Sequence, residues 1–96
     1  MAYRLTRRAR RDVLNIWSLI AEDNEPAADR FIDLVTHHFR LLGEMPYLGR
    51  QRDEIRSGYR SFPVGAYLIF YRVMKPGVHI MHVVQGYLNL QRYPFD

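Results

Sequence analysis

The chain of 96 residues carries a formal charge of +4, with 14 basic and 10 acidic residues, and has no cysteine. Its length predicts one domain over residues 1–96, and its 48% hydrophobic content excludes a disordered chain. The lack of cysteine excludes disulfides and thiolate metal sites. No apolar stretch has the length of a signal peptide or membrane span, so we expect a cytoplasmic protein without a membrane partner.

Arginine supplies nearly all of the positive charge, since Lys75 is the only lysine. The guanidinium group stays charged and binds carboxylates and phosphates through a planar fork, which indicates an acidic partner. Arg7, Arg8, Arg10 and Arg11 form a basic cluster at the start of the first predicted helix. Positive charges there oppose the helix dipole, so the cluster is either a solvated face or an anchor for an acidic partner.

The first predicted helix follows a short strand-compatible segment at residues 2–5. Thr6 is a typical N-cap, and the residues after it show a helical apolar period with arginines off the stripe. Trp17 lies on this apolar stripe, so we expect it to pack in the core. The apolar positions are Ala9, Val13, Ile16, Trp17 and Ile20.

A second predicted helix begins after the polar break at residues 23–25. Pro26 suits its first turn, and its apolar stripe runs from Ala28 to Leu42. Met45 precedes Pro46, and the residue before a proline avoids the helical region, so the helix ends there. The short connection predicts an antiparallel helical hairpin.

Three later segments have the composition of strands: residues 60–62, 67–73 and 78–85. The middle segment is apolar on both faces, which indicates a central strand, and residues 74–77 form a turn. The predicted order is β-α-α-β-β-β. This is an α+β domain with the helical hairpin on one face of a largely antiparallel sheet.

The four histidines do not have metal-ligand spacing. His37 and His38 are adjacent on a helix and point about 100° apart. His79 and His82 are three apart on a strand, so we expect them to face opposite sides of the sheet. We therefore predict no metal site.

An ordered series of motifs along almost the whole chain resembles the ParE toxins of bacterial type II toxin–antitoxin systems. No single motif is diagnostic of this family, but the ordered series of motifs at matching spacings is. Its members are Tyr3-Arg4-Leu5-Thr6, residues 16–24 from Ile16-Trp17 onward, Ala27-Ala28-Asp29-Arg30-Phe31-Ile32, Pro46-x-x-Gly49-Arg50, Glu54-Ile55-Arg56-x-Gly58-Tyr59-Arg60, and residues 67–73.

The resemblance implies a single toxin domain of the RelE/ParE-like fold over residues 1–96, of the kind that serves in plasmid stabilisation. It implies a hetero-oligomer with a ParD-like antitoxin and inhibition of DNA gyrase by binding. It implies no cofactor, no catalytic residue and no sequence-specific binding of nucleic acid.

Two alternatives stay open. The RelE branch of this superfamily cleaves messenger RNA on the ribosome and places a basic residue where this chain has Leu68. The end of the last strand is also uncharged here, at Gln85-Gly86-Tyr87-Leu88-Asn89, where relatives carry basic residues. A ribonuclease is therefore the minor alternative, and a non-toxic member retained for antitoxin binding is another.

The central strand predicts the antitoxin site. Leu68 and Phe70 share one face and Tyr67, Ile69 and Tyr71 the other, so one apolar set lacks the helices as cover. The resemblance places Leu68 and Phe70 on the open face, where an apolar groove takes the antitoxin, unless the tail and loops bury both sets. We expect a charge at Phe70 to weaken the complex while the domain stays folded. The full set of antitoxin-binding candidates is Leu68, Phe70, Arg72, Arg10 and Arg11.

The target-binding candidates are basic residues and one tyrosine after the second helix. The ribonuclease alternative would have to use the same residues, because RNA cleavage without a metal needs proton transfer and cations for the phosphorane. These candidates are Arg50, Arg56, Arg60, Tyr87 and Arg92.

Overall fold

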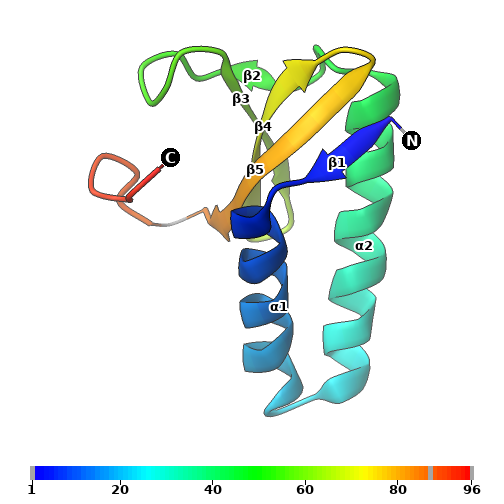
Figure 1. The fold of residues 1–96 in the computed structure, drawn as a ribbon. Coiled ribbons are helices and arrows are strands. Elements are labelled where there is room, and N and C mark those ends of the chain that lie inside the picture. Colours follow the sequence, from blue (N-terminus) through cyan, green and yellow to red (C-terminus); the bar gives the residue numbers. More distant parts are fainter. Residues whose placement is uncertain (1, 87, 96) are drawn as a thin grey trace.

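The computed structural model describes residues 2–86 and 88–95 and folds them into two helices on a mixed sheet (Figure 1). The predicted α+β class and element order are confirmed. The elements are β1 (Tyr3–Leu5), α1 (Arg7–Ala21), α2 (Glu25–Glu44), β2 (Arg50–Gln51), β3 (Tyr59–Val64), β4 (Tyr67–Met74) and β5 (Gly77–Gln85).

Both helices begin with a side-chain cap, α1 at Thr6, as predicted, and α2 at Asn24, which was not predicted as a cap. The Thr6 hydroxyl accepts a hydrogen bond from the Ala9 amide at 3.1 Å, and the Asn24 side chain accepts one from the Ala27 amide at 3.1 Å. Pro26 lies in the first turn of α2, where its missing N–H costs nothing. None of the helices in the described residues is both long and apolar enough to cross a membrane.

The helical hairpin packs on one face of the sheet, and its connecting turn lies away from the sheet (Figure 1). Residues of both helices share a core with alternate residues of the strands, including Val35, Phe39, Ile69 and Ile80. Trp17 differs from expectation, because it is half-buried and its Nε1 donates to the Asp29 carboxylate at 3.1 Å. It joins the two helices at their exposed side instead of filling the core.

The sheet has the strand order β1-β5-β4-β3-β2. β1 pairs parallel with β5, and the other neighbours pair antiparallel. β2 was not predicted, since a two-residue strand shows no alternation; it is recognised only by its pairing of Arg50 with Ser61. β4 is central, as predicted.

A β-bulge in the β4–β5 pair changes which residues share a face. His79 pairs with Arg72 and His82 pairs with Phe70, with a register shift between Phe70 and Tyr71. Met81 is the extra residue, so His79 and His82 lie on the same face of the sheet. The prediction that they face opposite sides is therefore wrong, because strict alternation fails at a bulge. Even so, no group of three or more metal-ligating side chains occurs among the described residues.

Candidate partner-binding surface

The sheet face opposite α1 and α2 is called the helix-free face here. The register of β4 places Leu68, Phe70 and Arg72 on this face and Ile69 and Tyr71 toward the helices. The predicted division of the central strand into two apolar sets is thus present.

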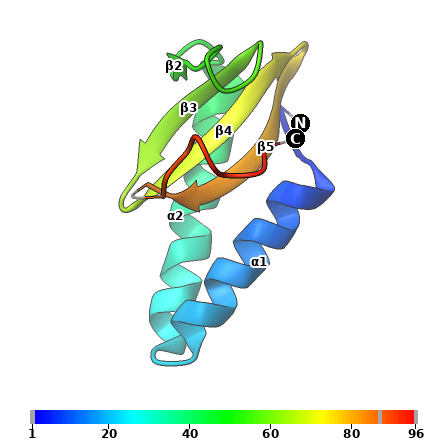
Figure 2. The same cartoon turned by 90° about the vertical axis from the view of Figure 1, so that its left-hand side faces the viewer.

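The C-terminal tail, residues 88–95, covers part of the helix-free face (Figure 2). The Phe95 ring lies 4.7 Å from the Phe70 ring, and Phe70 has no exposed surface. Leu68 is half-buried beside this second core. The expectation of an open apolar groove at Phe70 is wrong for the chain alone, because the tail's own aromatic residues bury it. A charge at Phe70 would therefore disturb the fold itself.

Two arginines fasten the tail. Arg8 of α1 donates to the Tyr93 hydroxyl at 2.6 Å, and its guanidinium lies 5.3 Å from the Tyr93 ring centre. Burial alone would lower the pKa of Arg8, but the hydrogen bonds that Arg8 donates to Tyr93 and Asp12 raise it above its ordinary value. Arg56 donates to the Phe95 carbonyl at 2.9 Å. The tail is thus tied both to α1 and to the loop before β3.

Asp12 links the contact between Arg8 and Tyr93 to strand β5 of the sheet. Its Oδ1 accepts from Arg8 Nε at 3.2 Å, its Oδ2 accepts from the Val83 amide at 3.0 Å, and His82 Nδ1 lies 3.9 Å from Oδ2. The contacts of Asp12 with Arg8, Val83 and His82 were not predicted from the sequence. The four-residue spacing of Arg8 and Asp12 was the available signal, since such pairs meet on a helix.

We expect Asp12→Ala to lower the free energy of unfolding by about 1–3 kcal/mol, because the buried Val83 amide loses its acceptor. Asp33→Ala, at an exposed position of α2, should change it by less than about 0.5 kcal/mol. Urea denaturation of both variants measures the difference. Equal free energies of unfolding for the two variants would show that the hydrogen bond from the Val83 amide to Asp12 does not stabilise the fold.

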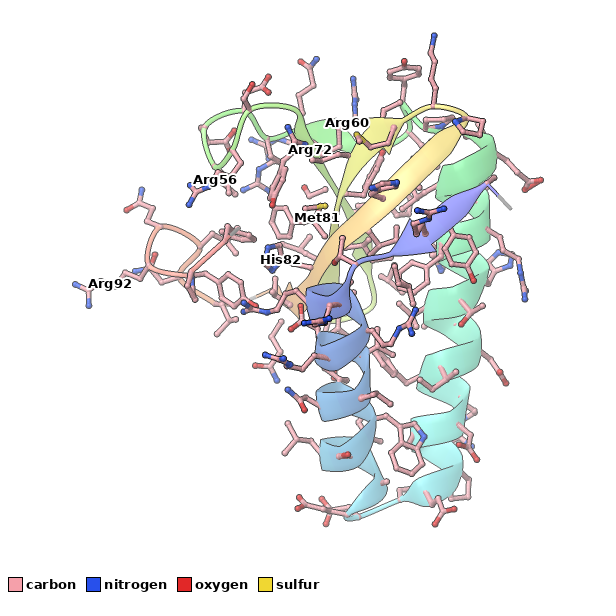
Figure 3. All side chains as sticks on the ribbon, viewed as in Figure 1. Arg56, Arg60, Arg72, Met81, His82 and Arg92 are labelled. Carbon is pink, nitrogen blue, oxygen red and sulfur yellow. The ribbon has the colours of Figure 1, made fainter. Side chains whose placement is uncertain are left out.

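Three of the predicted arginines bind the protein's own main chain. Arg56 donates to the Ile55 carbonyl at 2.8 Å as well as to Phe95, Arg60 donates to the Gly49 carbonyl at 2.7 Å, and Arg72 donates to the Ser57 carbonyl at 3.1 Å. Arg60 and Arg72 also stack over the rings of Tyr47 and Tyr59. These arginines hold loops in place, and Figure 3 shows Arg56, Arg60 and Arg72 at the same end of the sheet.

The other predicted residues do not join this group. Arg50 is exposed on β2, and Arg92 is exposed on the tail, away from the labelled arginines of the sheet (Figure 3). Arg10 and Arg11 are exposed on α1. Tyr87 lies outside the described residues.

A groove of about 430 Å³ separates the loop before β3 from the tail. Arg52, which the sequence analysis missed, lies in it and donates to Glu54 at 2.8 Å and to the Ser61 hydroxyl at 3.1 Å. The hydrogen bond from Arg52 lowers the pKa of Glu54, so this carboxylate is ionised at neutral pH. An ionised, arginine-paired carboxylate is a poor proton donor, and it partly cancels the positive charge that a phosphate would need.

Tyr71 secures the loop that leads into β2. Its hydroxyl accepts from the Gly49 amide at 2.7 Å and donates to the Pro46 carbonyl at 2.8 Å. A β-carbon on Gly49 would overlap this hydroxyl, which explains the glycine. Burial raises the pKa of Tyr71 above its ordinary value of 10.0, although the Gly49 amide and Arg60 act in the opposite direction.

The raised pKa of Tyr71 gives a pH-dependent prediction. The neutral hydroxyl stabilises the fold fully below pH 10, the ordinary pKa, and this contribution is lost as pH rises through the raised pKa of the folded state. The stability advantage of the wild type over Tyr71→Phe should therefore shrink above pH 10. Denaturant titrations at neutral and alkaline pH measure it, with Tyr47→Phe, at an exposed ring, as the control. A constant advantage across this range would contradict the assignment.

A solved structure described as a chromosomal ParDE TA system from P. aeruginosa shares the fold, with a TM-score of 0.75 and 18% identity. The match covers 88% of this chain and 95% of that one. The helical hairpin on a mixed sheet is thus the fold of that chain.

Relatives in sequence show which protein family the chain belongs to. The profile described as ParE toxin of type II toxin-antitoxin system, parDE, matches residues 3–86. Toxin ParE1 of Caulobacter vibrioides is 32% identical over 93 residues, covering 95% of each chain. Toxin RelE3 of the same organism is 34% identical over 77 residues, covering 79% of this chain and 84% of the relative. The chain belongs to the ParE toxin family of type II toxin–antitoxin systems.

Proposed function

We propose that this toxin is held inactive by a ParD-like antitoxin in a cytoplasmic hetero-oligomer and, when free, inhibits DNA gyrase by binding it. The observation that carries the proposal is the family match over residues 3–86. The similar fold of a chain from a ParDE system supports an antitoxin of the ParD kind. The gyrase target follows from the resemblance to ParE toxins.

The geometry of the described residues favours binding over catalysis. Arg56, Arg60 and Arg72 are engaged with main-chain carbonyls, and Glu54 is paired with Arg52. The half-buried Leu68 stands where RelE-like proteins have a cation. The similarity to Toxin RelE3 nevertheless makes ribosome-dependent RNA cleavage the second candidate.

Purified toxin separates these two functions. We expect it to inhibit supercoiling by purified gyrase and to leave messenger RNA intact in a translating ribosome extract. Inhibition should disappear when the cognate antitoxin is added. Site-specific transcript cleavage with unimpaired gyrase would overturn the proposal in favour of a ribonuclease.

Arg50 and Arg92 are the target-binding candidates best suited to mutation, since both are exposed. Arg50→Glu and Arg92→Glu test whether these positions contact gyrase, and we expect each to weaken inhibition while thermal unfolding stays unchanged. Arg30→Glu on α2 makes the same charge change at another exposed position and serves as the matched control. Equal inhibition by all three variants would remove Arg50 and Arg92 from the target surface.

A further inference from the structure

The charged side chains of this protein are distributed unevenly over the fold. Residues 22–33, at the end of the helical hairpin, hold five of the ten acidic residues and only one of the fourteen basic residues. These charged residues are all exposed, and Figure 1 shows that this end of the hairpin lies away from the sheet. The positive charge is therefore concentrated around the sheet, and the molecule has a negative end and a positive end.

Three basic side chains form a row across the helix-free face of the sheet. Arg4 of β1 pairs with His79 of β5, and His79 pairs with Arg72 of β4. Their neighbours along each strand pack in the helix-side core, so all three side chains face the other way. Arg4 and Arg72 are exposed, and His79 is half-buried. Because adjacent strands lie about 4.8 Å apart, the row is about 10 Å long.

The protein's own contacts hold the Arg72 end of this row in position. The guanidinium of Arg72 donates to the Ser57 carbonyl at 3.1 Å and lies 5.7 Å from the centre of the Tyr59 ring. A guanidinium has several N–H donors, so this hydrogen bond leaves others for a ligand. An arginine that is already oriented loses less side-chain entropy when it binds.

The acidic side chains of the loop before β3 are engaged with their own loop and do not neutralise the row. Asp53 accepts from the Gly58 amide at 2.8 Å, and Glu54 pairs with Arg52 at 2.8 Å. Within residues 2–86 and 88–95, no carboxylate forms an ion pair with any of the three side chains of the row. The row therefore keeps its positive charge for an anion from outside the chain.

We propose that this row binds the phosphate backbone of duplex DNA without reading its sequence. The planar fork of arginine suits phosphate oxygens, and each strand of the duplex presents a phosphate about every 3.4 Å along the axis. The row lies on a sheet face and not on a protruding helix, so it contacts phosphates and not the base edges inside a groove. The choice of DNA among polyanions rests on the proposed function, because gyrase acts on duplex DNA.

The charge distribution also fixes how the protein lies on the duplex. Phosphates attract the sheet and repel the acidic end of the hairpin at residues 22–33, so the hairpin points away from the DNA. The competing occupant is an acidic protein segment, but the centre of a protein interface is an apolar or aromatic anchor. The row is entirely basic, and the ring beside Arg72, that of Tyr59, is buried. A surface that is polar and positively charged is typical of DNA interfaces.

Binding of the purified toxin to a short fluorescent duplex of random sequence tests the proposal. We expect a dissociation constant on the order of 10⁻⁴–10⁻⁶ M at physiological salt. Two arginine–phosphate contacts should weaken binding about tenfold between roughly 50 and 200 mM salt. Polyglutamate, measured at the same salt, is the competing probe. Failure to bind the duplex at the lower salt, or equal affinity for polyglutamate, would overturn the assignment to DNA.

Neutral variants test whether the row makes these contacts. Arg4→Gln and Arg72→Gln should each weaken binding and reduce the slope of log affinity against log salt by about 0.9, the value of one phosphate contact. Arg30→Gln, at the acidic end, makes the same change in net charge and should leave the slope unchanged. Arg72 also holds the loop before β3, so Arg4→Gln decides if Arg72→Gln loses thermal stability. Equal slopes for Arg4→Gln and Arg30→Gln would contradict the proposal.

Gyrase takes no part in this measurement, so failure of this inference and failure of the proposed function are distinguishable. Inhibition of gyrase by a toxin that does not bind the duplex would overturn only the assignment of the row. A toxin that binds DNA through Arg4 and leaves gyrase active would support the row and refute gyrase as the target.

Discussion

Phe95→Ala is expected to lower the free energy of unfolding by about 3 kcal/mol, although the residue is next to the end of the chain. Its ring is 6% exposed and contacts the rings of Phe70, His82 and Tyr93. The value is at the lower end of the range for replacing a buried phenylalanine by alanine. Thermal and urea unfolding measure the effect.

Arg92→Ala is the matched control for Phe95→Ala, since Arg92 is exposed on the same tail. It should change stability by less than about 0.5 kcal/mol. Binding of a dye specific for exposed apolar surface should increase only in Phe95→Ala, as Phe70 becomes uncovered. Equal stability of Phe95→Ala and wild type would show that the tail does not seal the helix-free face.

Gly77→Ala is expected to lower the free energy of unfolding by about 3 kcal/mol or more. A β-carbon on Gly77 would overlap the carbonyl group of Ala2, so β1 would have to separate from β5. Tyr3 and Leu5 would then leave the helix-side core. Denaturant unfolding measures the loss.

Gly65→Ala distinguishes crowding from backbone strain. Gly65 has a positive φ of 57°, yet a β-carbon there would meet no atom within 4 Å. The change should cost only about 1–2 kcal/mol, the penalty of a left-handed conformation. If Gly77→Ala were as stable as wild type or stabilised the fold, the close approach of β1 to Gly77 would be wrong.

Local signals predicted the elements well. Thr6 caps α1, Pro26 and Pro46 mark the first turn and the end of α2, and the two-sided apolar pattern identified β4 as central. These features depend on neighbours in sequence, so the chain itself displays them.

Features set by distant contacts escaped prediction. The bulge at Met81 is visible only in the pairing of β4 with β5, and it reversed the predicted side of His82 relative to His79. Docking of the tail depends on two contacts that join distant parts of the sequence. Tyr93 accepts a hydrogen bond from Arg8, 85 residues earlier, and the Phe95 ring packs against the Phe70 ring. No local period encodes such contacts.

The candidate site was predicted in part. Leu68, Phe70 and Arg72 do share the helix-free face, but alternation cannot reveal what covers a face. Likewise, Arg60 and Arg72 were predicted to bind a partner because of their charge, but they donate to the carbonyls of Gly49 and Ser57. Only the folded backbone brings these carbonyls near. Their roles in partner binding stay predictions.

The most direct test of the central claim, a toxin neutralised by its antitoxin, is the growth of bacteria that express this chain under an inducible promoter, alone or with the product of the adjacent reading frame. We predict growth arrest on induction of the chain alone, with DNA-damage signalling, and full growth on co-expression. Unimpaired growth of cells that accumulate the folded chain alone would contradict the account and indicate a non-toxic member.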